Sequence, residues 1–158
     1  MSEVTAKLEW VNGLQFNVNL PESRTVELNS AEEIGEAFTP MELFLVALAG
    51  CSAMDLQWIM EKQRQKVDKF EVSIRGVRRD EDPRYFERII VEYSFIGQNI
   101  SKDAVERAVR LSHEKYCSVK AMIKDSVRVD ISYTITDNQG TKQKFHYLAL
   151  AAPATQSH

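Results

Sequence analysis

The chain has little cysteine: Cys51 and Cys117 are its only thiols among 158 residues. There is no CxxC or comparable close pair, and of the three histidines, His146 and His158 lie in the tail. A zinc site needs about four nitrogen, sulfur or oxygen ligands, usually with some of them closely spaced. We therefore expect no metal site and no cofactor.

An excess of basic charge is also absent. Lys+Arg is 20 and Asp+Glu is 23, for a net charge of −3, which gives no electrostatic case for binding nucleic acid or an anionic membrane. The start of the chain lacks the basic and apolar regions of a signal peptide. The longest apolar run, residues 43–54, is shorter than the roughly 20 residues that span a bilayer. We expect a cytoplasmic protein with no nucleic-acid or membrane partner.

Repeats, low-complexity tracts and linkers are missing too, so the sequence predicts a single domain over residues 1–158. Apolar–polar alternation predicts strands near residues 8–20, 24–28, 70–74, 89–95 and 127–135, with Asn12-Gly13 as a hairpin turn. Residues 137–158 form a C-terminal extension, read as one extra strand and a frayed tail. The predicted class is α+β with mostly antiparallel sheets.

Three helices are expected. Thr39 and Pro40 open a long one over residues 40–66, and Ser101 caps a second. A short third helix begins near Cys117 or Ser118. The first half of the long helix is apolar on nearly all sides, whereas one sheet covers only one side of a helix. A second subunit is therefore expected to cover the rest, which predicts a homodimer.

Cys51 lies in the apolar half of the long helix. The residues that share its helical face are mostly apolar: Phe44, Ala47, Leu48, Met54, Asp55 and Trp58. Such surroundings raise a thiol pKa, and Asp55 would raise it further. Cys51 is then either an inert packing residue or a nucleophile that needs a cation, a base or a helix terminus from elsewhere in the protein.

Cys117 lies at a predicted helix start, where unpaired N–H groups favour a thiolate. The alternative is an ordinary cysteine at a helix entry. Nearby His113 is a possible general base, although a half-exposed histidine at a helix end is the more common case.

Two charged residues are candidates for activating a cysteine. Arg24 is the sole arginine before Arg64, and so the only N-terminal candidate for a cation beside a thiolate. Glu42 lies on the far side of the regular helix from Cys51, and it could orient an arginine only from the first turn or across a dimer contact. Its simpler role is an acidic residue near a helix N-terminus.

The segments TPMELFLVALAGCSAMD and KYCSVKAMI together resemble the OsmC/Ohr family of osmotically inducible protein C and organic hydroperoxide resistance proteins, in its OsmC-like branch. The resemblance covers roughly residues 1–135. It implies an intertwined homodimer in which antiparallel sheets wrap two long central helices.

The resemblance also implies a two-cysteine peroxidase for alkyl or lipid hydroperoxides that serves in oxidative stress defence. Cys51 would attack the hydroperoxide and Cys117 would close a disulfide, which an external dithiol then reduces. In the well-studied relatives an arginine held by a glutamate activates the first cysteine. Met41 stands at the glutamate position here, Glu42 follows it, and Arg24 substitutes for the arginine. The alternative is a dimer with little peroxidase activity that binds a small apolar ligand between its subunits.

Overall fold

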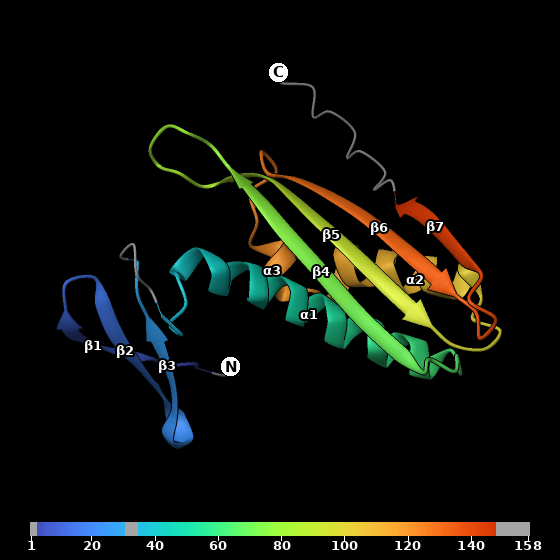
Figure 1. The fold of residues 1–158 in the computed structure, drawn as a ribbon, viewed down its shortest axis with the longest axis horizontal. Coiled ribbons are helices and arrows are strands. Elements are labelled where there is room, and N and C mark those ends of the chain that lie inside the picture. Colours follow the sequence, from blue (N-terminus) through green and yellow to red (C-terminus); the bar gives the residue numbers. More distant parts are fainter. Residues whose placement is uncertain (1–2, 31–34, 148–158) are drawn as a thin grey trace. The chain divides into compact units, whose positions relative to one another are not determined.

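The computed structural model describes residues 3–30 and 35–147. The chain divides into two compact units, Met1–Val46 and Ala47–His158, with the boundary inside the long helix. The class is α+β, as predicted (Figure 1). The elements are β1 (Lys7–Asn12), β2 (Gln15–Leu20), β3 (Arg24–Leu28), α1 (Pro40–Lys62), β4 (Lys69–Arg78), β5 (Phe86–Ile96), α2 (Lys102–Leu111), α3 (Ser118–Ala121), β6 (Arg128–Thr136) and β7 (Lys142–Tyr147).

In the first unit β1, β2 and β3 form an antiparallel sheet in chain order. The predicted turn at Asn12-Gly13 is confirmed, with a positive φ of 44° at Gly13, where a residue without Cβ is favoured. One face of the sheet is apolar because its cross-strand partners match: Leu8↔Val18↔Val26 and Trp10↔Phe16↔Leu28. Trp10 is 67% exposed, so this face is only partly covered within one chain.

Helix α1 begins with a capping box, which confirms Thr39 as its cap. The Thr39 amide and hydroxyl donate to Glu42 Oε2 at 2.8 and 2.9 Å, and the Glu42 amide donates to Thr39 Oγ1 at 3.2 Å. These bonds to the charged carboxylate lower the pKa of Glu42. The start of the helix at Pro40 follows from this local sequence.

The end of α1 was predicted too far along the chain. The helix stops at Lys62 rather than at residue 66. Arg64 takes a positive φ of 57°, and the Gln65 amide closes the helix by donating to the Met60 carbonyl at 3.0 Å. The charged residues after Lys62 offer no apolar stripe that would favour another turn.

The second unit is built on a four-stranded sheet with the order β4-β5-β6-β7. β4–β5 and β6–β7 pair antiparallel, whereas β5 and β6 pair parallel. The parallel pair needs a long crossover, which α2 and α3 supply. The strand predicted in the C-terminal extension is confirmed as β7 up to Tyr147, and the predicted frayed tail lies outside the described residues.

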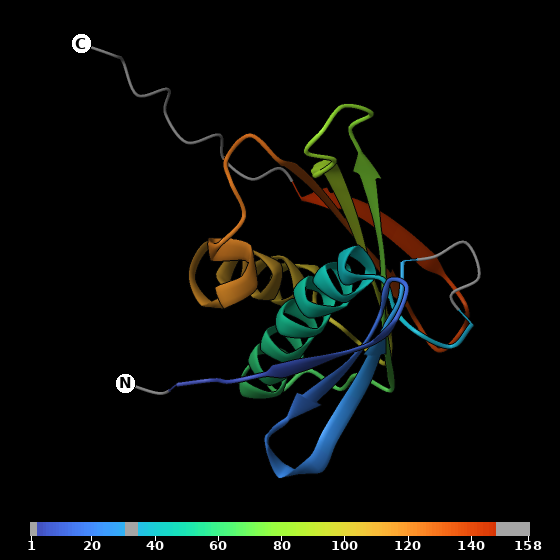
Figure 2. The same cartoon turned by 90° about the vertical axis from the view of Figure 1, so that its left-hand side faces the viewer.

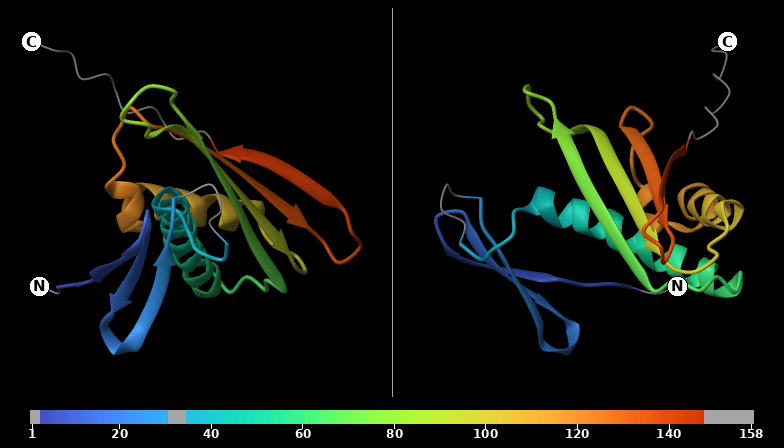
Figure 3. Two further views of the ribbon diagram at one scale, coloured as in Figure 1. Left: turned by 60° about the vertical axis from the view of Figure 1, so that its left-hand side comes forward. Right: turned by 45° about the vertical axis from the view of Figure 1, so that its right-hand side comes forward.

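One face of this sheet carries the core. Tyr93 on β5 lies opposite Val72 on β4 and Tyr133 on β6, and Phe70 stacks on Phe95 with ring centroids 4.5 Å apart. Figures 2 and 3 show the later turns of α1 together with α2 and α3 on the same side of the sheet. The fully buried side chains they share include Leu48, Leu56, Met60, Ile89, Val91, Val105 and Val109. The apolar side chains that alternate along these strands therefore face the helices.

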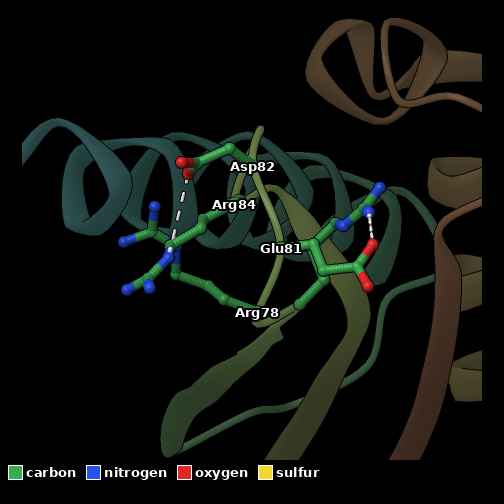
Figure 4. A network of polar contacts seen from close by, with 5 residues as sticks. Arg78, Glu81, Asp82 and Arg84 are labelled. Atoms are coloured by element: carbon green, nitrogen blue, oxygen red, sulfur yellow. Dashed lines mark hydrogen bonds and ion pairs between the residues drawn. The ribbon is translucent and has the colours of Figure 1, made fainter.

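The turn between β4 and β5 contains Asp82-Pro83, whose peptide bond is cis. Figure 4 shows the charged side chains that surround this turn: Arg84 Nε lies 3.8 Å from Asp82 Oδ1, and Arg79 pairs with Glu81 at 2.8 Å. The acidic partners are 94% and 85% exposed, and exposed pairs contribute little to stability. The charge cluster is therefore a solvated turn.

By length and composition alone, α1 is able to cross a membrane, with a window of mean hydropathy 1.6. Its inner stripe, however, is buried against the sheet and includes Ser52, whose hydroxyl donates to the carbonyls of Leu48 and Ala49. A polar and partly buried residue, Asp55, also lies on it. These contacts account for α1 as the core helix of this fold.

Candidate functional site at the two cysteines

The fold brings the two cysteines together. Cys51 lies in the middle of α1, and Cys117 is the N-cap of α3. The Sγ atoms of both residues and a carboxylate oxygen of Asp55 all lie within 4.8 Å of one another. Both thiols are free; Cys117 is buried and Cys51 is half-buried. Two residues far apart in the sequence thus form one dithiol.

Cys117 is positioned by a tight piece of backbone. A π-helical turn, Ser112–Tyr116, follows α2, and the Cys117 amide donates to the Ser112 carbonyl at 2.8 Å. This turn carries the chain from α2 into α3. The turn places the Cys117 side chain beside Cys51 and Asp55. Cys117 Sγ also accepts a hydrogen bond from the Lys120 amide at 3.4 Å.

Burial raises the pKa of the Cys117 thiol to about 11. The Lys120 N–H opposes this rise, while Cys51 and Asp55 add to it. The N–H at the helix N-terminus lowers the pKa of Cys117, as expected, but burial outweighs it. α3 spans only Ser118–Ala121, so one N–H group works against nearly complete desolvation.

Asp55 is the site member whose contacts were missed. Its place one turn after Cys51 was evident, but its approach to Cys117 was not. The Ser112 hydroxyl donates to Asp55 Oδ2 at 2.9 Å and so fixes the carboxylate beside both thiols. Ser112 is fully buried and continues the buried stripe of α2, which includes Val105, Ala108 and Val109. A polar residue within that stripe was the available signal, since a buried hydroxyl needs a partner.

A second polar pair lies beside the thiols. The Tyr93 hydroxyl and His113 Nε2 are 2.7 Å apart. Burial raises the pKa of Tyr93, a hydrogen bond with Ser52 opposes the rise, and the charges of Cys117, Asp55 and Cys51 add to it. His113 lies in the turn directly after α2 and is half-buried, as expected of a histidine at a helix end. Burial and then Lys120 lower the pKa of His113 to about 4, so the ring is neutral at pH 7.

The two predicted activating residues make other contacts in this structure. Arg24 lies at the start of β3 in the first unit, and its Nε donates to the Pro21 carbonyl at 3.1 Å. Glu42 accepts the bonds of the capping box. Within residues 3–30 and 35–147, no lysine or arginine forms an ion pair with Asp55. The roles of Arg24 and Glu42 toward Cys51 stay predictions.

Comparison with known proteins gives a consistent result. Residues 33–132 match the family described as OsmC-like protein. The chain is 40% identical over 135 residues to Protein YhfA of Escherichia coli K12, covering 82% of this chain and 96% of that protein.

Solved structures agree. A hypothetical protein from Aquifex aeolicus VF5 superimposes with a TM-score of 0.78 at 32% identity, over 87% of this chain and 98% of the other. An organic hydroperoxide resistance protein OsmC from Legionella pneumophila has a TM-score of 0.66 at 17% identity, over 84% and 97% of the two chains, and this likeness shows the fold alone. The chain belongs to the OsmC-like protein family.

Proposed function

We propose that this protein is a thiol peroxidase that reduces organic hydroperoxides with Cys51 and Cys117. The observation that carries the proposal is the meeting of two free thiols, from different helices, within 4.8 Å. A disulfide requires sulfur atoms about 2.05 Å apart. The two Sγ atoms must therefore approach by less than about 3 Å, which is within the range of side-chain rotation and small backbone adjustment.

The reaction balances in three steps. The Cys51 thiolate attacks the distal oxygen of ROOH and the O–O bond breaks, so that Cys51 becomes a sulfenic acid and the alkoxide RO⁻ takes a proton from water and leaves as ROH. The Cys117 sulfur then attacks the Cys51 sulfur, forming the disulfide and releasing water. An external dithiol reduces the disulfide and is itself oxidised to a disulfide.

The surroundings of Cys117 suit the second step. With a pKa of about 11, Cys117 remains a thiol at neutral pH and leaves the first attack to Cys51. When Cys117 attacks the sulfenic acid, its proton must leave. The Asp55 carboxylate lies within 4.8 Å of the sulfur and is a suitable acceptor.

The apolar character of α1 favours alkyl or lipid hydroperoxides over hydrogen peroxide. Trp58 and Met54 follow Cys51 on the helix and are 52% and 75% exposed. Trp58 also makes an edge contact with Tyr116, beside Cys117, at a centroid distance of 6.1 Å. An alkyl chain would gain apolar contact on this surface, whereas hydrogen peroxide would gain none. The similar structure from Legionella pneumophila, an organic hydroperoxide resistance protein, is in keeping with this class.

The proposal includes a cytoplasmic homodimer. The apolar side chains Val46, Met54 and Trp58 of α1 are exposed, as are Leu8 and Trp10 of the first sheet. Exposed apolar surface of this extent is typical of an association interface. Arg24 and Glu42 remain the candidates for activating Cys51 within such a dimer.

The test begins with metal-free, fully reduced protein. Incubation with cumene hydroperoxide should remove both thiols and form one intramolecular disulfide, as followed by mass spectrometry. Cys51→Ser should abolish peroxide consumption, and Cys117→Ser should accumulate sulfenic and then sulfinic acid at Cys51. Reduced protein that keeps both thiols under these conditions contradicts the proposal. Ligand stabilisation by apolar acids would then favour the alternative of a binding protein.

A further inference from the structure

We propose that the reduced protein binds a thiophilic divalent cation, of the Zn²⁺ class, through Cys51 Sγ, Cys117 Sγ and the Asp55 carboxylate. These three ligand atoms already lie within 4.8 Å of one another. In a tetrahedral zinc site, Zn–S bonds of about 2.3 Å place the sulfur atoms roughly 3.8 Å apart. A cation at the centre therefore requires only a small inward movement of the side chains.

The sequence has no closely spaced cysteines and histidines, and for that reason no zinc site was expected. The fold, however, brings together a ligand set from residues that lie far apart in the sequence. Cys51 and Asp55 are one helical turn apart on α1, where positions i and i+4 share a face, and Cys117 arrives from the α3 N-terminus. Two thiolates and one carboxylate form a ligand set that zinc accepts, with the fourth position left for water.

Contacts of the outer shell support the three ligands. Ser112 donates to Asp55 Oδ2, which leaves Oδ1 of that carboxylate available for a metal ion. The Lys120 amide donates to Cys117 Sγ, and an N–H donor stabilises a thiolate ligand. Ligands of metal sites are commonly oriented by such second contacts. Both contacts are present in this structure, so the ligands are already partly oriented.

The charge balance points the same way. With both thiols ionised, the three side chains carry three negative charges in a partly buried place. Within the described ranges, no lysine or arginine forms an ion pair with Asp55. A divalent cation would compensate two of these charges, and it would displace the two thiol protons on binding.

This inference goes beyond the proposed peroxidase and concerns the same dithiol. Metal-bound thiolates are not free to attack a hydroperoxide, and a disulfide cannot supply two thiolate ligands. The metal-bound and disulfide states would therefore exclude each other. Hydroperoxide would oxidise the dithiol only after the ion dissociates, and the disulfide that forms could not bind the ion again.

The experiment titrates chelator-treated, reduced protein with Cd²⁺, which produces a thiolate-to-metal absorption band, and measures Zn²⁺ affinity by competition with a chromophoric chelator. We expect one ion per chain. Asp55→Asn should weaken Zn²⁺ binding at least about tenfold, and Ser112→Ala by roughly tenfold. The matched control is Asp125→Asn, an exposed acid that should bind as the wild type does. Cys51→Ser and Cys117→Ser should each remove most of the absorption band.

Cd²⁺ binding without a thiolate band, or equal Zn²⁺ affinity in wild type and Asp55→Asn, overturns the inference. Circular dichroism of each variant shows whether it is folded, and a folded variant makes its binding result interpretable. The two proposals fail separately. If metal-free protein consumes hydroperoxide but reduced protein binds no Zn²⁺, only the metal-site proposal is contradicted. If the protein binds Zn²⁺ but consumes no hydroperoxide, only the peroxidase proposal is contradicted.

Discussion

The Ser112 hydroxyl donates a hydrogen bond to Asp55 Oδ2 at 2.9 Å, and this bond joins α1 to the end of α2 beside both thiols. This hydrogen bond holds the Asp55 carboxylate beside the sulfur atoms of Cys51 and Cys117. Its negative charge helps to raise the pKa of Cys117, after burial and the neighbouring Cys51. The carboxylate would thus act on the dithiol both in the proposed peroxidase reaction and in the proposed metal site.

Replacing Asp55 should make Cys117 more acidic. In metal-free Cys51→Ser protein, the further change Asp55→Asn removes a like charge and should lower the pKa of Cys117 by up to about one unit. Thiolate absorbance measured against pH reports the midpoint. Asp125→Asn in the same background is the control, and it should leave the midpoint in place. An unchanged midpoint in Asp55→Asn would show that the carboxylate does not act on Cys117.

His113 should make the protein sensitive to acid. Its pKa is about 4 in the folded protein and near 6.5 when unfolded, so between these values the unfolded chain binds the extra proton. The contribution of His113 to the free energy of unfolding is fully present above about pH 6.5 and is lost as the pH falls toward 4. At pH 5 the free energy of unfolding should be lower by about 2 kcal/mol.

Urea unfolding at pH 7 and pH 5 measures this loss. His113→Gln removes the titrating ring and should reduce the difference between the two pH values. His146→Gln, at an exposed position of β7, is the matched control and should keep the wild-type difference. An equal pH dependence in His113→Gln and wild type would assign the acid sensitivity to other groups.

Much of the fold could be predicted from local sequence. The Asn12-Gly13 turn, the Thr39 and Ser101 caps and the alternation of β5 and β6 depend on neighbouring residues, and all are confirmed. The parallel pairing of β5 with β6 was not foreseen, because it depends on how α2 and α3 cross the sheet. The end of α1 was predicted too far along the chain. The residue that ends the helix in the left-handed conformation is Arg64, whereas the usual sequence signal for such an end is a glycine.

The site was predicted less completely. Cys51 and Cys117 were identified from the sequence. The sequence also indicated a helix N-terminus at Cys117, which lowers a thiol pKa, but it did not reveal that Cys117 is buried, which raises the pKa. Asp55, Ser112 and Tyr93 come from three different elements. Their contacts are set by tertiary packing, which no local pattern contains.

Removing a core side chain between α1 and the sheet should destabilise the second unit. Leu56 is fully buried, so Leu56→Ala loses apolar contact and leaves a cavity, at a cost of about 2–5 kcal/mol. The midpoint of urea unfolding should fall accordingly. Met122→Ala, at a side chain 75% exposed, is the control and should change stability by less than about 0.5 kcal/mol. Equal effects of the two substitutions would contradict the packing described for α1.

Arg24 should affect the rate of Cys51 oxidation if it activates this thiol in the dimer. Arg24→Ala should slow single-turnover oxidation by cumene hydroperoxide at neutral pH by at least about tenfold, with partial recovery at higher pH. Arg110→Ala, on the exposed side of α2, should react at the wild-type rate. A wild-type rate and pH profile in Arg24→Ala would remove Arg24 from the activating role.

The exposed apolar surfaces should hold the homodimer together. Met54 on α1 is 75% exposed and Trp10 on β1 is 67% exposed within one chain. Met54→Glu and Trp10→Glu place a charge where a partner would bury the side chain, and each should raise the dimer dissociation constant by at least about thirtyfold, which corresponds to about 2 kcal/mol. Light scattering after size-exclusion chromatography, over a range of concentrations, measures the change. Val77→Glu is the control, on an exposed position of β4, and should leave the dimer intact. A wild-type chain that runs as a monomer, or glutamate variants as dimeric as the wild type, would show that these faces do not join two subunits.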